Sequence, residues 1–236
     1  MLHDQQGGGV RTLTLARPER GNALSAELVE ALLAAVQGAA ADSSLHTLLL
    51  RAEGDHFCTG LDLSSLDSET DASLLWRLVR IETLLAALWH APLRTVAVAQ
   101  GRCWGAGADL FVACETRIAA EATQFRFPGA GFGIVLGTRR LAERVGTDMA
   151  RRCTVDGQLL AAPDAQRVGL VSRLGGLGQT DLAAPVADAV TAAALRRATR
   201  SDQRDHDLAA LVRSAARPGL KARVQAYRAA QTKKAP

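Results

Sequence analysis

The chain has 236 residues, 48% of them hydrophobic, which is enough for one domain with an apolar core. Aromatic residues make up only 4%, so the core must consist mainly of Ala, Leu and Val. The net charge of +4 comes from scattered arginines and not from a basic stripe interleaved with aromatics. This pattern argues against nucleic-acid binding, although a mildly basic surface suits a polyanionic small ligand.

The cysteines, residues 1–9 and the length of the apolar runs indicate the cellular compartment that the sequence predicts. The four cysteines show neither a CxxC motif nor metal-ligand spacing, which predicts free, mostly buried thiols, a reducing cytoplasm and no metal site. Residues 1–9 have no basic segment followed by an apolar one, so they do not resemble a signal peptide. Apolar runs are too short to cross a bilayer, and we expect no membrane partner.

The first half of the chain alternates strand patterns with helix patterns. Ser25 is a plausible N-cap for a helix with an apolar face, and residues 72–89 carry a single apolar stripe at helical spacing. Strands are expected at residues 10–16, 45–50 and 95–99, and a further helix at 106–114. This alternation predicts an α/β fold.

The second half begins with short strands and ends in helices. Strands are expected at 117–120 and 123–127, then a glycine-rich loop at 129–137, then helices around 139–144, 148–154 and 163–168. Residues 181–231 are rich in Ala and Arg and carry no strand signal, which predicts two or three helices.

Two glycine-punctuated loops, HFCTGLDL at 56–63 and AQGRCWGAGADL at 99–110, form the most informative feature. Each follows a predicted strand and is expected to run into a helix. If one backbone N–H from each loop pointed at the same place, the pair could hold a negatively charged oxygen, as an oxyanion hole does.

Asp109 adds a carboxyl group beside this candidate anion site. Ala106 falls in the first turn of its predicted helix, where the N–H groups have no internal partner and the dipole favours an anion. Asp109 is three residues further on and shares that helix face, an arrangement that suits proton transfer next to a polarised carbonyl. A packing role for the loops and a capping role for Asp109 remain open.

These motifs resemble the enoyl-CoA hydratase/isomerase (crotonase) superfamily. The resemblance rests on RPERGNAL at 17–24, FCTGLDL at 57–63, and VAVAQG at 96–101 with GAG at 105–107, followed in family order by 117–120, 141–146 and 165–172. It implies a crotonase-type spiral of ββα units over residues 1–175. It also implies a helical C-terminal oligomerisation region at 176–236, which in this family builds trimers that often pair into hexamers.

The same resemblance implies an acyl-CoA thioester ligand, a place in fatty acid metabolism and no cofactor beyond the coenzyme A of the substrate. The two oxyanion N–H groups would be those of Leu61 and Ala106. The path of coenzyme A would be lined by Asn22, Ala23, Leu24, Asp62, Leu63 and Ser64. Arg17 and Arg20 would either meet the phosphates of coenzyme A or lie in a solvated turn.

The chain departs from the family at the catalytic acids. The family's hydratases use two glutamates; the first falls on Asp109, which is one methylene shorter, and the second on Gly129, which has no acid. The loop at 134–138 is also shorter than the family's version. The other residues near the motifs are expected not to be catalytic. Glu82 is expected to be a solvated helix residue, Glu115 and Glu121 structural residues, His56 a solvated or capping loop residue, and Trp104 a pocket wall or core residue.

The sequence therefore predicts an enzyme that holds the enolate of an acyl-CoA thioester at Leu61 and Ala106, with Asp109 as the general acid and base. Its nominal activity is enoyl-CoA hydratase or isomerase, and a single acid favours isomerase-like proton transfer. The alternatives are a CoA-thioester-binding homologue with little hydratase activity, or a CoA-ester hydrolase or decarboxylase. RNA binding ranks last.

Overall fold

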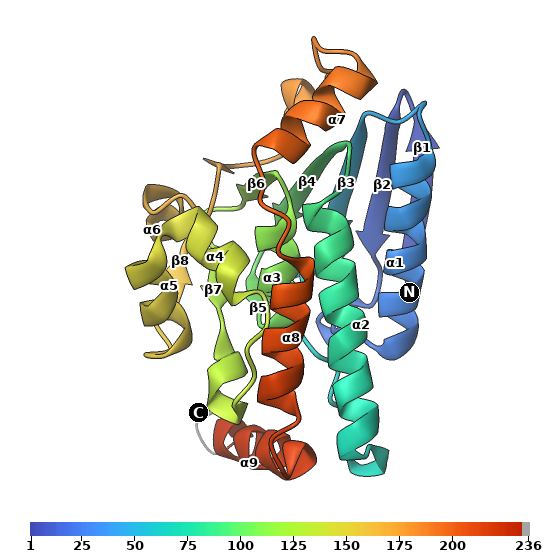
Figure 1. The fold of residues 1–236 in the computed structure, drawn as a ribbon. Coiled ribbons are helices and arrows are strands. Elements are labelled where there is room, and N and C mark those ends of the chain that lie inside the picture. Colours follow the sequence, from blue (N-terminus) through green and yellow to red (C-terminus); the bar gives the residue numbers. More distant parts are fainter. Residues whose placement is uncertain (233–236) are drawn as a thin grey trace.

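The computed structural model describes residues 1–232 and is built on a six-stranded sheet (Figure 1). Its strands, in spatial order, are β1 (Leu2–Gly7), β2 (Val10–Leu15), β3 (Thr47–Ala52), β4 (Arg94–Ala99), β6 (Thr116–Ala119) and β9 (Arg173–Leu174). β1 and β2 form an antiparallel hairpin, and every later neighbour pairs in parallel. Parallel pairs need crossover connections, which the helices supply.

A second, smaller sheet has three strands, and the chain winds between the two sheets as a spiral. It contains β5 (Arg102–Trp104), β7 (Gln124–Arg126) and β8 (Leu160–Ala161), with β5 parallel to β7 and β7 antiparallel to β8. β4 runs into β5 and then into α3 (Ala106–Ala113), so one turn of chain supplies a strand to each sheet and then a helix. The α/β spiral of ββα units expected from the sequence is therefore confirmed.

The two long helices cover one face of the large sheet. α1 (Ala26–Ala41) and α2 (Asp71–Trp89) lie side by side across it (Figure 1). Ser25 caps α1, since its Oγ accepts a hydrogen bond of 3.2 Å from Leu28 N. The apolar stripe of α2 is wholly buried, as predicted; it consists of Leu74, Leu78, Ile81, Leu85 and Leu88. The short helices α4 (Thr138–Val145), α5 (Thr147–Thr154) and α6 (Ala162–Arg167) lie near the other end of the sheet.

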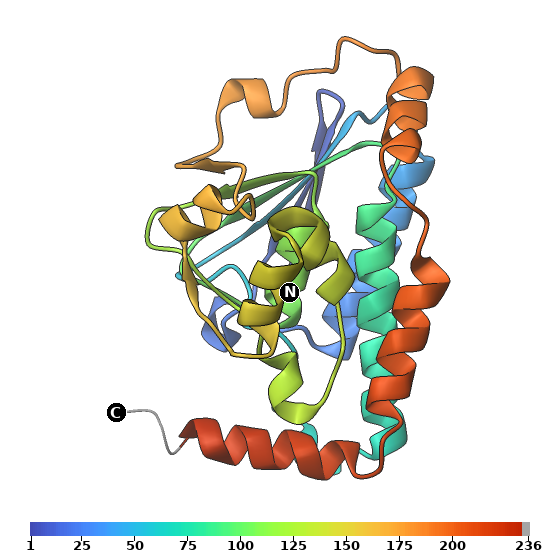
Figure 2. The same cartoon turned by 60° about the vertical axis from the view of Figure 1, so that its left-hand side comes forward.

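The C-terminal helices fold back onto their own chain. α7 (Ala189–Ala198), α8 (Arg204–Ala215) and α9 (Leu220–Thr232) follow one another, with α8 running along α2 and α9 crossing beneath it (Figure 2). Leu211 and Val224 from these helices join a buried cluster with Leu78 of α2 and Ile134. The tail therefore forms part of the same core as α2.

Several elements differ from the expectation. β1 is a strand although its sequence is polar, because Gly8 and Gly9, both at positive φ, turn the chain so that it pairs with β2. β5, β8 and β9 are two or three residues long and were not predicted. The first glycine loop leads into a 3₁₀ turn at Leu66–Ser68 before α2 begins, so it does not run directly into a helix.

The cysteine prediction is confirmed in structural terms: Cys58, Cys103, Cys114 and Cys153 are all free and buried. Within residues 1–232, no helix is both long enough and apolar enough to cross a membrane. The same described part of the chain holds no group of three or more side chains arranged to bind a metal ion.

Candidate active site

The two glycine loops lie directly against each other. Trp104 N donates to Cys58 O at 3.0 Å, and Cys58 N donates to Arg102 O at 3.3 Å. A third segment joins them, since Leu24 N donates to Gly60 O at 2.8 Å and Asp62 N donates to Leu24 O at 3.1 Å. Backbone hydrogen bonds therefore bring three distant stretches of sequence to one place.

Glycine is required where the loops meet. Gly60 has a φ of +97°, and a Cβ there would lie 2.9 Å from Trp104 O and 3.4 Å from Ala106 N. At Gly107 a Cβ would lie 2.3 Å from Cys58 O, closer than any real contact. The absence of side chains at these two positions is what lets the loops approach so closely.

Two residues at this contact line one cavity with backbone N–H groups that are available as donors. Leu61 and Ala106 both line it, and within residues 1–232 neither N–H has a hydrogen-bond acceptor. Ala106 is the first residue of α3, so its N–H is one that a helix leaves unpaired. The arrangement can hold a negatively charged oxygen, with the helix dipole adding to the attraction.

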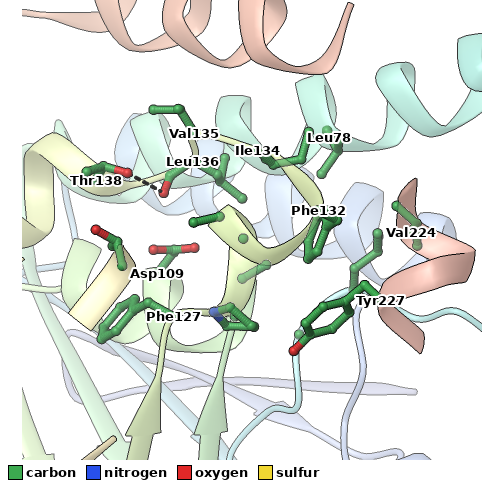
Figure 3. A pocket seen from close by; sticks show the side chains of 18 of the residues that line it. Leu78, Asp109, Phe127, Phe132, Ile134, Val135, Leu136, Thr138, Val224 and Tyr227 are labelled. Atoms are coloured by element: carbon green, nitrogen blue, oxygen red, sulfur yellow. Dashed lines mark hydrogen bonds between the residues drawn. The ribbon is translucent and has the colours of Figure 1, made fainter. Parts of the chain in front are cut away.

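The cavity has a volume of about 270 Å³ and a mainly apolar lining (Figure 3). Apolar side chains come from the first glycine loop, from α2, from the segment 127–136 and from α9; they are Leu61, Leu63, Leu78, Phe127, Phe132, Ile134, Val135, Leu136, Val224 and others. Polar side chains are few, namely Thr59, Asp109, Thr138, Thr154 and Tyr227. Such a lining suits an apolar acyl group presented beside the two N–H donors.

Asp109 is the one carboxyl side chain among the described residues that line this cavity (Figure 3). It is 6% exposed, and no hydrogen bond ties its carboxylate to another group in residues 1–232. Burial raises the pKa of Asp109 well above the usual carboxyl value; nearby Glu82 raises it further, and Arg140 opposes the shift. A carboxylate in this state readily takes up a proton.

Gly129 also lines the cavity but offers no acid. It lies in the 3₁₀ segment Pro128–Phe132, where its carbonyl accepts a hydrogen bond of 2.9 Å from Ile134 N. A Cβ at this position would lie 3.1 Å from Ile134 O, so even a small side chain would be tight.

The other acids considered from the sequence lie outside the cavity. Glu115 pairs with Arg196 at 2.7 Å and with Arg200 at 3.4 Å, and Glu121 is exposed. The expectation that Glu82 is solvated was wrong: it is 2% exposed and bonded to Arg140 by contacts of 2.6 and 3.1 Å. Its partner is 58 residues away, so the local sequence did not reveal this ion pair.

Asn22 supports the fold of its turn rather than facing a ligand with its side chain. It is fully buried at a φ of +54°. Its Oδ1 accepts from Arg17 N at 2.8 Å, and its Nδ2 donates to the carbonyls of Glu53 and His56 at 2.9 and 2.8 Å. At 0% exposure Asn22 presents neither its side chain nor its backbone to a ligand.

The remaining residues expected along the coenzyme A path differ in accessibility. Leu24 is fully buried and Ala23 is 8% exposed, whereas Leu63 is half-buried and Ser64 is exposed. Asp62 is buried; burial alone would raise its pKa, but hydrogen bonds from Ser64 and Arg17 outweigh this and hold the pKa below the usual carboxyl value.

The two arginines of the first motif behave differently. Arg17 is occupied within the protein, donating to Ala23 O at 2.9 Å and to Asp62 Oδ2 at 3.0 Å. Arg20 is exposed and pairs with no acid in the described part of the chain. Of the two, Arg20 is the one available for a phosphate.

His56 and Trp104 are loop residues that do not line the cavity. The Nδ1 of His56 lies 3.4 Å from Arg102 N, which ties the two loops together. Trp104 stacks against the guanidinium groups of Arg102 and Arg126, 4.8 and 5.9 Å from its ring centre. Trp104 is therefore half-buried beside the loops and not a wall of the cavity, and His56 accepts a backbone hydrogen bond.

Arg77 supports the site and was missed from the sequence. It lies in the buried stripe of α2 and donates to Asp62 O at 2.7 Å and to Leu24 O at 3.2 Å, while its other nitrogen meets Glu69 at 2.8 Å. An arginine within an apolar helical stripe is the signal that could have identified it.

We expect Arg77→Met to lower the free energy of unfolding by about 2 kcal/mol, because it leaves two carbonyls without a charged donor. Loosening of residues 24 and 62 should also weaken binding of CoA thioesters. Urea unfolding and calorimetric titration measure the two effects. Arg80→Met is the matched control, since Arg80 is on the same helix but pairs at the surface with Glu30; equal effects of the two changes would refute the role of Arg77.

Sequence comparison assigns the family. The family model for enoyl-CoA hydratase/isomerase matches residues 5–233. The chain belongs to this family. It is 33% identical over 206 residues to probable enoyl-CoA hydratase echA6 of Mycobacterium leprae, which covers 85% of this chain and 81% of that protein. It is 31% identical over 217 residues to enoyl-CoA hydratase AFT6-1 of Alternaria alternata, covering 86% and 71%.

Solved structures of the enoyl-CoA hydratase/isomerase family share the fold. A homologue from Bordetella parapertussis superposes with a TM-score of 0.93 at 41% identity, over 97% of this chain and 98% of that one. An enoyl-CoA hydratase from Bacillus halodurans superposes with a TM-score of 0.82 over 95% and 99%; at 22% identity it supports the fold alone. The crotonase fold and an enzymatic family are therefore established for this chain.

Proposed function

We propose that this enzyme isomerises an enoyl-CoA thioester by moving one proton between carbon atoms, with Asp109 as the sole general acid and base. The observation that carries the proposal is a cavity lined by one buried carboxyl group and by Leu61 and Ala106, whose N–H groups have no acceptor within residues 1–232. Both features are needed to form an enolate and to return its proton.

The chemistry runs in two steps. The thioester oxygen accepts hydrogen bonds from the N–H groups of Leu61 and Ala106, and the carboxylate of Asp109 removes a proton from C2 of a 3-enoyl thioester. The electron pair of that C–H bond moves to the oxygen as a dienolate, which the two donors stabilise. Asp109 then gives the proton to C4, which yields the conjugated 2-enoyl thioester.

Hydration is less favoured by these residues. Adding water across a double bond requires one group to activate the water and another to manage the proton at the α-carbon. Gly129 supplies neither, and the other described acids lie outside the cavity. The raised pKa of Asp109 suits a base that must both accept and return a proton.

A second candidate is a CoA-thioester-binding protein with little turnover. The shorter arm of Asp109 and the tight backbone at Gly129 favour it, since an acid misplaced by ~1 Å can lose on the order of a hundredfold in rate. Hydrolysis or decarboxylation could use the same oxyanion site. Micromolar binding without turnover in isomerase, hydratase and hydrolase assays would support the binding protein and overturn the isomerase.

We further propose a trimer or hexamer in the cytoplasm, acting in fatty acid metabolism with no cofactor beyond the substrate's coenzyme A. α7 supports an oligomer, because Val190 and Leu195 on this helix are 77% and 57% exposed. Light scattering after gel filtration tests this, and a monomer at micromolar concentration would contradict it. Leu63, Ser64 and Arg20 are the accessible groups that we assign to coenzyme A.

The pH dependence of kcat/KM should follow the ionisation of Asp109. Because burial holds its pKa well above the usual carboxyl value and the base form reacts, kcat/KM should rise with pH through that raised pKa. Initial rates with a 3-enoyl-CoA across a constant-ionic-strength buffer series measure this. A profile already flat from the ordinary carboxyl range upward would exclude Asp109 as the base.

A further inference from the structure

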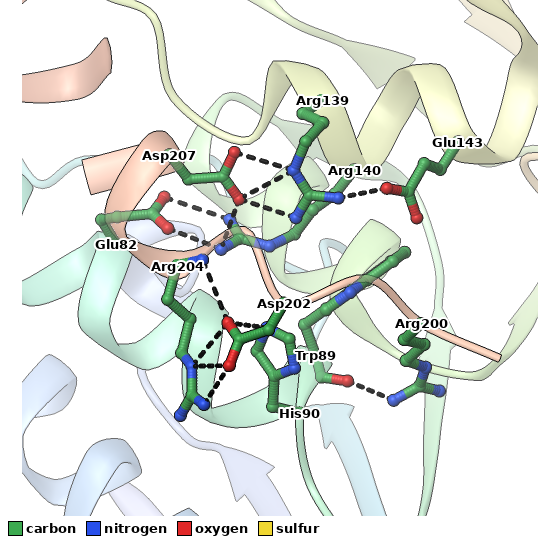
Figure 4. Close-up of polar contacts among 10 residues, drawn as sticks. All are labelled: Glu82, Trp89, His90, Arg139, Arg140, Glu143, Arg200, Asp202, Arg204 and Asp207. Carbon is green, nitrogen blue, oxygen red and sulfur yellow. Dashed lines mark hydrogen bonds and ion pairs between the residues drawn. The ribbon is translucent and has the colours of Figure 1, made fainter. Parts of the chain in front are cut away.

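One buried guanidinium links three helices through polar contacts (Figure 4). Arg140 of α4 donates to Glu82 of α2 at 2.6 and 3.1 Å and lies 3.2 Å from Asp207 of α8. Side-chain exposure is 1% for Arg140, 3% for Glu82 and 9% for Asp207. Arg139 encloses Asp207 from the other side with contacts of 2.7 to 3.1 Å.

Burying these charged groups costs desolvation free energy, so the cluster is an inefficient way to stabilise the fold. Charges removed from water lose hydration that their mutual attraction restores incompletely, and apolar side chains of similar size often stabilise a core as well. Arg140 also has a buried Nε that meets no acceptor in the described part of the chain. Stability alone therefore does not account for these buried charges, and a second role for them would act through α4, the helix that carries Arg140.

The N-terminus of α4 touches the proposed catalytic carboxyl group. Gly137 is the N-cap of α4, and a Cβ on it would lie 2.3 Å from Asp109 Oδ1 and 2.7 Å from Asp109 Cγ. Arg140 follows Gly137 by three residues, within the first turn of the same helix. Any movement of that turn therefore changes the space that the carboxylate occupies.

The cluster also surrounds Asp109 with charge. The ionisable groups that act on it from neighbouring helices are Glu82 on α2, which raises its pKa, and Arg140 on α4, which lowers it. From β5, the thiol of Cys103 has a pKa well above its usual value, mainly because it is buried, and the charge of Asp109 adds to this rise. Asp207 contacts Arg140 at 3.2 Å and is not among the charges that shift the pKa of Asp109 directly.

We propose that Arg140 is a positioning residue: held by Glu82 and Asp207, it fixes the first turn of α4 and thereby places the Asp109 carboxylate in the cavity. α8 thus contributes to the site although none of its residues lines the cavity. This inference rests on the proposed function in one respect, namely that Asp109 is the group that reacts.

The test compares Arg140→Met, Arg140→Lys and Glu82→Gln, with Asp205→Asn as the control on an exposed position of α8. We expect Arg140→Met to lower kcat roughly tenfold or more while the Kd of a CoA thioester stays within about twofold. Arg140→Lys, which keeps the charge, should restore part of the rate. Asp205→Asn should match the wild-type protein.

A second measurement does not need turnover. In ¹³C-labelled protein, the carboxyl resonance of Asp109, assigned by its loss in Asp109→Asn, can be titrated directly. Its midpoint should move to lower pH in Glu82→Gln and to higher pH in Arg140→Met, opposite shifts that general loosening of the core would not produce.

An unchanged Asp109 titration in both folded variants would overturn the inference. If Arg140→Met does not fold, Glu82→Gln, which keeps the size of the side chain nearly constant, decides the inference: its Asp109 midpoint should move to lower pH, and an unchanged midpoint would overturn the inference. If the wild-type protein has no turnover but the two midpoints shift as stated, the proposed function fails and the positioning role of Arg140 stands.

Discussion

Asp109→Asn should lower kcat by about 10²- to 10⁴-fold, the range expected when a general acid or base is removed. The amide keeps the size of the side chain but can neither take a proton from C2 nor return one to C4. Binding of the thioester should persist with a Kd within about twofold, because the N–H groups of Leu61 and Ala106 are untouched. Stopped-flow rates and calorimetric titration measure the two quantities.

The same variant should be more stable than the wild-type protein at neutral pH. The folded-state pKa of Asp109 is raised above its unfolded value, so ionisation costs stability as pH rises from the unfolded pKa towards the folded one. The amide has no such cost, and the difference in melting temperature should vanish in acid. Asp148→Asn, an exposed acid in the first turn of α5, is the matched control. An Asp109→Asn protein with unchanged kcat would remove Asp109 from the mechanism.

Gly60→Ala should reduce kcat by on the order of a hundredfold or more, the loss seen when an oxyanion donor is removed. The added Cβ would lie 2.9 Å from Trp104 O and 3.4 Å from Ala106 N, and φ is +97°, so the two loops must separate. The N–H groups of Leu61 and Ala106 would then no longer converge on one oxygen. Steady-state kinetics, with circular dichroism to confirm the fold, measure the effect.

Gly8→Ala is the control for Gly60→Ala, because it introduces backbone strain without a close contact between the loops. Gly8 also has a positive φ, of +57°, but a Cβ there meets nothing within 4 Å. Its substitution should lower stability slightly, by about 1 kcal/mol, and leave kcat unchanged. If Gly60→Ala were as active as Gly8→Ala, the two loops would not form the oxyanion site.

Much of the fold follows from local patterns in the sequence. The apolar stripe of α2, the Ser25 cap of α1 and the apolar strand β3 each satisfy a local rule, and each was predicted within a few residues. β1 was not, because its polar sequence becomes a strand only through pairing with β2. The short strands β5, β8 and β9 likewise depend on tertiary pairing rather than on propensity.

The sequence predicted the parts of the candidate site that the backbone of the two loops forms. Gly60 and Gly107, where the loops meet, belong to the two glycine-punctuated loops that the sequence singled out, and the place of Asp109 beside Ala106 follows from helical spacing. The roles of Asn22 and Glu82 were not predictable, because their partners lie 31 and 58 residues away in the sequence. Polar residues that satisfy distant groups inside a core carry no local signal.

The products formed from a 3-enoyl-CoA and from crotonyl-CoA test the central claim most directly. Ultraviolet absorbance of the conjugated thioester, with mass spectrometry of the products, follows both reactions. The account predicts that the 3-enoyl substrate gains conjugated absorbance at constant mass with the wild-type protein and not with Asp109→Asn. Loss of absorbance from crotonyl-CoA at a comparable rate, with the mass of one water added, would contradict a single-acid isomerase.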